Sequence, residues 1–396
     1  MRLVTTALLF LFAAPLLAQT SSFQLHGFLT ARGIRVKAQP SWTEGGYGRF
    51  DVGGDTPDDG KTVNVDVAQL GLDWTPTSWM LIHADGVARR EPSGTGGKRA
   101  GVVQAFADLY TEKLRLRAGS FWLPTSRENV DPLWNSRYTI TYSAANSWIG
   151  QEVRPTGIDL QYSPTFYLSA GATAFRDNDT MGTMLAARGW TFGNRLSVYK
   201  EELPLPPPDT KDTEPIGPDL DHRTGYAGRI RLSLPERAMI QFARIDNRAE
   251  LVPDINGYTP WLTRFNVVSA DLGASGRATI AAEWVYGTTA VGFPGGSFTM
   301  DFDTAYILFS GKSGEADRWT VRVERFSTHA HNPTRYDSTK ENGHAWTLAW
   351  FREVNPHLRT GIEYLNVKGE RPGAMEVGFD PNTGGSAITL EVRYGF

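Results

Sequence analysis

Charged side chains recur at every second position in several short stretches of the chain. Arg115 and Arg117 alternate with Leu114, Leu116 and Ala118. Successive side chains of a β-strand point to opposite faces, so such a stretch has one charged face and one apolar face. Charges of both signs along one face suit an aqueous lumen better than a packed core. The same period places further candidate lumen residues at Arg229, Arg231, Glu283, Arg322, Glu324, Glu391 and Arg393.

Residues that could support catalysis or metal binding do not form a complete motif. His26 and His83 fall on polar-face positions, and the spacing leaves open a serine–histidine pair with either of them. His329 and His331 lack a nearby third metal ligand. Four aspartates in a Gly-rich segment lack the spacing of an EF-hand: Asp51, Asp55, Asp58 and Asp59. We therefore predict no catalytic residue, no metal site and no cofactor.

The composition excludes several classes of protein. The 396 residues include no cysteine, which excludes disulfides, thiolate metal sites and a cysteine nucleophile. The net charge of −3 provides no general attraction for nucleic acid, so no nucleic-acid partner is expected. Beyond the N-terminus, no window approaches eighteen continuous apolar residues, which excludes a transmembrane helix.

The N-terminus has the order of a secretory signal peptide. Arg2 precedes an apolar run from Leu3 to Leu17, and the small residue Ala18 precedes Gln19. We predict a cleaved signal over residues 1–18 and a single barrel domain over 19–396. An uncleaved anchor is the alternative, but the apolar run is short for a membrane span.

The last predicted strand gives the clearest indication of the class of protein. Ile388, Leu390, Val392, Tyr394 and Phe396 form an apolar row, and charged or polar residues alternate with them. A soluble sandwich can alternate in this way. The row with its final phenylalanine, however, resembles the C-terminal strand of bacterial outer-membrane proteins. That resemblance implies that Tyr394 and Phe396 form an assembly signal. It also implies the outer membrane of a Gram-negative-type bacterium, with outer-membrane lipids and the barrel-assembly machinery as partners.

The spacing of turns predicts an all-β, antiparallel, up-and-down transmembrane barrel. Short periplasmic turns and long outer loops alternate in this class, which needs an even strand count. Eight turns and nine loops predict 18 strands. The segments Met184–Thr191 and Phe265–Leu272 are weakly patterned, and merging a pair gives the alternative of 16. The Pro-rich stretch Leu203–Pro218 is expected to be an exposed loop. The predicted turns are Thr75–Ser78, Glu112–Lys113, Ser163–Thr165, Phe192–Asn194, Pro235–Glu236, Ala274–Arg277, Gly311–Asp317 and Asn355–Pro356.

The third outer loop, Ser120–Pro155, is the longest and the richest in aromatic anchors. It follows the fifth predicted strand, and in this position it resembles the inward-folded constriction loop of general porins. The spacing Gly119-x-Phe121-x-x-Pro124 also resembles the phosphate-selective porin O/P family. That family lines its pore with lysines, whereas the candidates here are arginines, so phosphate selectivity does not carry over. The charged loop candidates are Arg127, Glu128, Asp131, Arg137, Glu152 and Arg154.

Two interpretations of these loop charges stay open. Loop carboxylates could oppose wall arginines such as Arg115 and Arg117 across a narrow gap and sort solutes by charge. Alternatively, the charges pair locally to hold the loop. The resemblance to porins implies a homotrimeric, passive diffusion channel for small hydrophilic solutes or ions. The inward arginines, offset by the acidic loop residues, predict a mild preference for anions. The alternatives are a barrel enzyme of lipase or protease type and an adhesive or structural barrel.

Overall fold

The computed structural model describes residues 22–55, 60–129, 133–207, 219–234, 237–252, 259–273, 276–331 and 339–396. The predicted signal peptide lies outside these ranges, as do Asp58, Asp59 and Asp131. Among the described residues, no helix combines the length and apolar character needed to cross a membrane.

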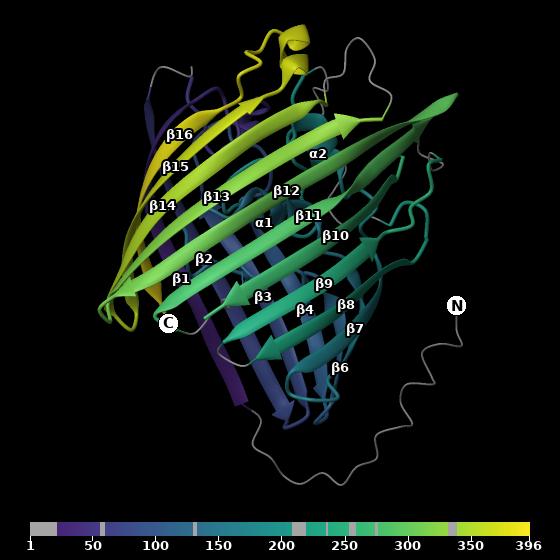
Figure 1. The fold of residues 1–396 in the computed structure, drawn as a ribbon, viewed down its shortest axis with the longest axis vertical. Coiled ribbons are helices and arrows are strands. Elements are labelled where there is room, and N and C mark those ends of the chain that lie inside the picture. The colour runs from purple at the N-terminus through teal and green to yellow at the C-terminus, as the bar shows by residue number, and fades with distance from the viewer. Residues whose placement is uncertain are drawn as a thin grey trace.

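Within the described ranges, sixteen strands close one antiparallel barrel (Figure 1). Each strand pairs with its neighbours in sequence, and β1 pairs with β16 to close the wall. The strands are β1 (Ser22–Ala38), β2 (Lys61–Thr77), β3 (Met80–Arg90), β4 (Ala100–Tyr110), β5 (Leu114–Ser120), β6 (Thr156–Tyr162), β7 (Leu168–Arg176), β8 (Gly225–Leu234), β9 (Ala238–Asp246), β10 (Trp261–Leu272), β11 (Ala278–Phe293), β12 (Gly296–Ser313), β13 (Asp317–Ala330), β14 (Glu341–Asn355), β15 (Leu358–Glu370) and β16 (Gly385–Gly395). Short helices lie in the connections: η1 (Trp42–Glu44), α1 (Ala144–Glu152), α2 (Thr183–Arg188) and η2 (Pro372–Val377).

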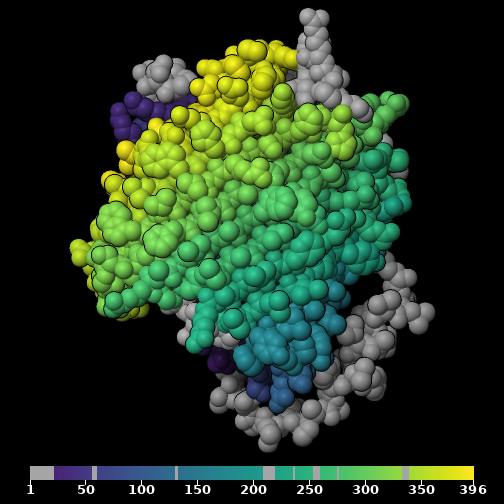
Figure 2. Space-filling view, in the orientation of Figure 1, coloured from purple at the N-terminus to yellow at the C-terminus, as the bar shows by residue number. Residues whose placement is uncertain are grey.

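The two-residue period of the sequence becomes the two faces of the wall. On β13, Trp319, Val321 and Val323 are exposed on the outside, whereas Arg322 and Glu324 are buried inside. The outer rows of the other strands are mostly apolar and exposed, which is the surface that lipid requires, although a few charged residues such as Arg244 and Arg264 also face outward. Figure 2 shows part of this continuous outer wall, from teal to yellow.

The barrel has one end of short turns and one end of mostly long loops. Both the first and the last strand meet the turn end, where Gly27 and Phe396 exchange backbone hydrogen bonds of 3.0 and 3.1 Å. Because each strand runs opposite to the one before it, two chain ends at the same end of the barrel require an even number of strands. From the sequence, Thr288–Ser297 is predicted as an outer loop. A short turn joins β11 to β12 there instead, because both strands continue through most of this segment.

The count of sixteen confirms the alternative, and the count of 18 is wrong. The predicted turn Phe192–Asn194 and the strands beside it do not exist. The segment Met184–Thr191 contains α2 instead, and Trp190 and Phe192 are buried inside the barrel rather than at the membrane interface. The other weakly patterned segment, Phe265–Leu272, does belong to a strand, β10.

The start of the Pro-rich stretch is also placed differently from the prediction. Leu203 is fully buried against Trp42 and Met184, so the expectation of a wholly exposed Leu203–Pro218 loop is wrong at this end. Residues 208–218 lie outside the described ranges.

Candidate functional site

Described parts of three outer loops fold back into the barrel. These loops are the first, between β1 and β2, the third, between β5 and β6, and the fourth, between β7 and β8. Phe192 donates its backbone N–H to the carbonyl of Arg49 (2.7 Å), which joins the fourth loop to the first. Tyr142 donates its backbone N–H to the carbonyl of Gly193 (2.8 Å), which joins the third loop to the fourth. We call the described residues of 39–54, 121–155 and 178–203 the loop plug. The predicted inward fold of the third loop is confirmed.

The start of the third loop explains the Gly119-x-Phe121-x-x-Pro124 spacing. Gly119 has a φ of +139°, and a Cβ there would lie 2.3 Å from the carbonyl oxygen of Ala105. Phe121 is fully buried, and the carbonyl of Pro124 accepts a hydrogen bond from Gln241 on β9 (2.9 Å). The motif therefore marks where the chain leaves β5 and enters the lumen.

An apolar core joins the loop plug to the wall. The Trp148 ring of α1 lies 5.1 Å from the ring of Phe265, 5.2 Å from Phe302 and 5.9 Å from Trp190, measured between centroids. In the outer half the inner face is therefore a hydrophobic core, not the watery surface expected along every strand. The wall contributes Val36, Val63, Val65, Val87, Val103, Phe175, Ile245, Phe265, Val267, Val285, Met300, Phe302, Phe326, Leu365 and Val367.

A fully buried arginine on β13 ties the third loop to the wall. Arg322 donates to Glu324 on its own strand (2.8 Å) and binds Glu128 of the loop. It also donates to the carbonyls of Thr141 (2.9 Å) and Tyr142 (3.1 Å). A buried charge is very costly unless it is paired and hydrogen-bonded, and this guanidinium satisfies both conditions. These three predicted lumen residues thus lie against the loop plug and hold it.

Wall carboxylates also bind backbone N–H groups of the loop. Glu363 accepts from the N–H of Ile140 (2.6 Å), and Glu324 accepts from the N–H of Ala144 (3.0 Å) at the start of α1. The first N–H groups of a helix have no partner within it, and a negative charge is favourable there. Glu283, another predicted lumen residue, accepts a hydrogen bond of 2.8 Å from the side chain of Asn146.

Glu152, at the end of α1, joins the third loop to the fourth. Its carboxylate accepts from the Trp148 indole (2.7 Å) and from the N–H groups of Met184 (2.9 Å) and Gly182 (3.2 Å). Gly182 is the N-cap of α2 and has no side chain to cap that helix, so Glu152 supplies the acceptor. Burial raises the pKa of Glu152 to about 7, although these hydrogen bonds favour the charged form.

Toward the turn end, arginines on the inner face stand in front of their carboxylate partners. Arg115 binds Asp159 (3.3 Å), and Arg117 binds Asp108 (2.7 Å). The side chains of Arg115 and Arg117 are 24% and 19% exposed, whereas both aspartates are 1% exposed. Water in this half therefore meets positive charge first. The same order holds for Arg127 with Asp271, Arg229 with Asp159, and Arg359 and Arg393 with Glu391.

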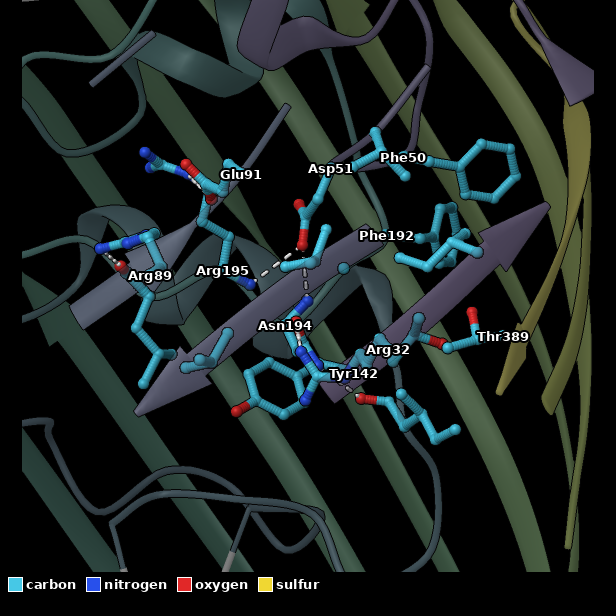
Figure 3. A pocket seen from close by; sticks show the side chains of 18 of the residues that line it. Arg32, Phe50, Asp51, Arg89, Glu91, Tyr142, Phe192, Asn194, Arg195 and Thr389 are labelled. Carbon is cyan, nitrogen blue, oxygen red and sulfur yellow. Dashed lines mark hydrogen bonds and ion pairs between the residues drawn. The ribbon is translucent and has the colours of Figure 1, made fainter. Parts of the chain in front are cut away.

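A small cavity remains between the loop plug and the wall formed by β1, β2 and β3 (Figure 3). Its volume is about 70 Å³, which suits a few water molecules but not an organic solute. Asp51 accepts from the N–H groups of Asn194 (2.7 Å) and Arg195 (3.0 Å) at its edge. Arg32 reaches from the wall to Asn194 (3.1 Å) and to Glu391 (2.9 Å).

The remaining predicted loop charges are divided between the two halves. Arg154 is buried and donates to the carbonyl of Ser197 (2.6 Å). Arg137 lines a hollow of about 250 Å³ near the turn end. Glu128 binds Arg322, and Glu152 binds the start of α2. These two carboxylates therefore do not face Arg115 and Arg117 across the lumen, as the predicted transverse electric field would require.

The other candidates are also separated by the fold. Asp51 points into the barrel, whereas the exposed Asp55 lies near Lys61 (3.4 Å), so these two do not share a site. His331 binds Asp301 on the outside (2.7 Å). The wall arginine Arg231 donates to Gln241 (2.9 and 2.7 Å).

The apolar half of the inner face was not predicted from the sequence. One signal was present: Phe265 and Val267 face inward while Val268 faces outward, so β10 is apolar on both faces. This is why the segment is weakly patterned. The fourth loop was not predicted either, because Trp190 fell in a predicted strand and Phe192 in the predicted turn beside it.

Comparisons with known proteins identify the fold. No family model matches the sequence, and no curated protein matches it. Among solved structures, the channel DcaP of Acinetobacter baumannii is 12% identical, with 95% of this chain and 97% of that chain covered and a TM-score of 0.60. OmpT of Vibrio cholerae is 9% identical (96% and 99% covered, TM-score 0.56), and an anion-selective porin from Comamonas acidovorans is 10% identical (95% and 100%, 0.55). The chain thus has the porin-like barrel fold.

Proposed function

We propose that this chain is an outer-membrane porin: a passive channel for small hydrophilic solutes or ions with a mild preference for anions. The observation that carries this proposal is the order of charges at the turn end. In six ion pairs the arginine side chain is more exposed than its carboxylate partner. Fixed positive charge beside a narrow aqueous passage favours anions, and the carboxylates behind it limit that preference.

The loop plug determines what can pass. Three loops with an apolar core occupy the outer half, so we expect a small single-channel conductance and exclusion of bulky solutes. Planar-bilayer recording of the purified protein tests the proposal. Stepwise openings with a reversal potential of anionic sign under a KCl gradient support it. A folded barrel that never conducts would contradict it.

The second candidate function is a closed structural or adhesive barrel, and the extent of the buried core in the loop plug favours it. Its outer loops, not its lumen, would carry the binding. The bilayer recording separates the two functions. The barrel-enzyme alternative would require a serine beside His26 or His83. Instead, both histidines form ion pairs with the carboxylate of Asp73.

Export, assembly and oligomeric state are part of the same proposal. The chain is exported with cleavage of residues 1–18 and inserts into the outer membrane of a Gram-negative-type bacterium. Tyr394 and the adjacent Phe396 form the signal read by the assembly machinery, and the exposure of both rings at the end of β16 supports this. A homotrimer is proposed because one OmpT structure of Vibrio cholerae is described as a trimer form. Light scattering of the detergent-extracted protein tests this state.

A further inference from the structure

Three neighbouring strands place two histidines and a carboxylate together on the inner face, near the turn end. His83 on β3 is paired directly with Asp73 on β2, and His26 on β1 is paired with Gly71, two residues from Asp73. The Nδ1 atom of His83 lies 2.6 Å from one oxygen of Asp73, and Nδ1 of His26 lies 3.7 Å from the other. Asp73 therefore lies between the two rings.

The missing side chain at Gly71 makes this arrangement possible. A Cβ at Gly71 would lie 2.6 Å from Nε2 of His26 and 2.6 Å from a methyl carbon of Leu133 in the third loop. The His26 ring thus occupies the space above Gly71 and leans toward Asp73, while Leu133 closes that space from the lumen side.

We propose that His26, Asp73 and His83 form a site for a divalent transition metal of the zinc class. Each residue offers one ligand atom, and these atoms lie within 4.8 Å of one another. Two imidazole nitrogens and a carboxylate oxygen are ligands that Zn²⁺ binds at about 2.0–2.2 Å. Ligands at that radius around a tetrahedral ion are about 3.3 Å apart. The two imidazole nitrogens face different oxygens of Asp73, at 2.6 and 3.7 Å, so the carboxylate must rotate slightly to present one oxygen to the ion.

A second carboxylate lies where a metal-binding histidine needs one. A ligating histidine usually offers its other ring nitrogen to a carboxylate, which fixes the ring. Nε2 of His83 is buried without a hydrogen-bond partner, and the nearest carboxylate oxygen, of Asp85, is 3.6 Å away. Asp85 is buried and is held by the N–H and the side chain of Gln104 (3.2 and 3.1 Å). The Phe106 ring stacks on His83 at 4.8 Å and limits its rotation.

One side of the trio is open to water. The side chains of His26 and Asp73 are 27% and 25% exposed, whereas His83 is 9% exposed. Three protein ligands leave a coordination position for water or for a solute donor on that side. The nearest arginine contact does not oppose a cation strongly: Arg117 stacks on Phe106 but is held by two hydrogen bonds to Asp108 (2.8 and 2.7 Å).

Zinc titration of the purified, tag-free full-length barrel in detergent tests the site, with calorimetry and metal analysis as readouts. We expect one Zn²⁺ per chain. His83→Gln or His26→Gln should abolish this binding, and Asp85→Asn should weaken it about 10- to 100-fold. His331→Gln is the matched control, because it removes an exposed histidine of the outer face that is paired with Asp301 (2.7 Å) and lies outside the proposed trio. Heat-modifiable migration confirms that each variant is folded.

Cobalt gives an independent readout. Co²⁺ bound by these three ligands should show the visible absorption of a four- or five-coordinate ion, and His83→Gln should lose it while His331→Gln keeps it. Absence of stoichiometric Zn²⁺ binding, or equal binding by the wild type and the folded His26→Gln and His83→Gln variants, would overturn the proposal. His83 and Asp73 would then be a hydrogen-bonded pair, and His26 would be their neighbour without a shared ligand. These measurements do not depend on conductance, so their failure is distinct from failure of the porin proposal.

Discussion

The two halves of the lumen are built on the same strands but have opposite chemistry. In the outer half, inward-facing Phe265 and Phe302 pack against Trp148 of the loop plug. In the turn half, inward-facing Arg115 and Arg117 are partly exposed above buried aspartates. Alternation along a strand therefore tells which residues face inward, but the loops decide whether the inner face is a core or a wet surface.

The largest expected effect comes from removing the centre of the apolar half. Trp148→Ala deletes a buried ring with three aromatic neighbours, which typically costs about 3–5 kcal/mol. The strand ladder does not depend on this ring, so the barrel should stay folded while the third loop loosens. We expect a higher single-channel conductance and faster amide exchange in residues 121–155.

Trp319→Ala is the control for this experiment. It removes the same side chain from the exposed outer face of β13. Conductance should stay at the wild-type level. Equal conductance of the Trp148 variant and the wild type, with the loop shown by exchange to be loosened, would mean that the loop plug does not restrict the passage.

The next effect is a pH dependence confined to the outer half. Burial raises the pKa of Glu152 to about 7, above its ordinary value of 4.5. Between these values the closed loop binds a proton that the opened loop releases, so the closed state loses stability as the pH rises from about 4.5 to 7. The loss is at most about 3 kcal/mol, since one pKa unit is worth about 1.4 kcal/mol.

Amide exchange of α1 and α2, corrected for the intrinsic rate at each pH, measures this dependence. Opening should be more frequent at pH 8 than at pH 4.5 in the wild type. In Glu152→Gln the difference should become smaller, because the amide does not titrate. The same pH dependence in the glutamine variant would assign it to another group.

The smallest effect is expected from the charges of the turn half. Arg115→Gln with Arg117→Gln removes two positive charges beside the passage. A unit charge about 6 Å from an ion in water contributes about 0.7 kcal/mol, which is about a threefold change in preference per arginine. The reversal potential under a KCl gradient should move toward cations. Arg244→Gln with Arg325→Gln removes equal charge from exposed arginines on the outer face and should leave it unchanged.

The position of each wall residue could be predicted, but its role could not. Strand alternation placed Arg115, Arg229 and Arg322 on one face, and all three lie on the inner face. It gave no reason to separate Arg322, which is fully buried against Glu128, from Arg115, which is partly exposed. That difference depends on how far each of the long loops descends.

The sequence by itself determined the barrel and narrowed the strand count to 16 or 18, because lipid and strand geometry impose a local period of two. The inward third loop followed from its position and its resemblance to the constriction loop of porins. Only the tertiary structure decided the rest. Trp190 and Phe192 resemble interfacial aromatics in sequence, yet they are buried inside the barrel. His26, Asp73 and His83 are distant in sequence and meet only through strand register. Both outcomes depend on long-range contacts, which a local pattern does not encode.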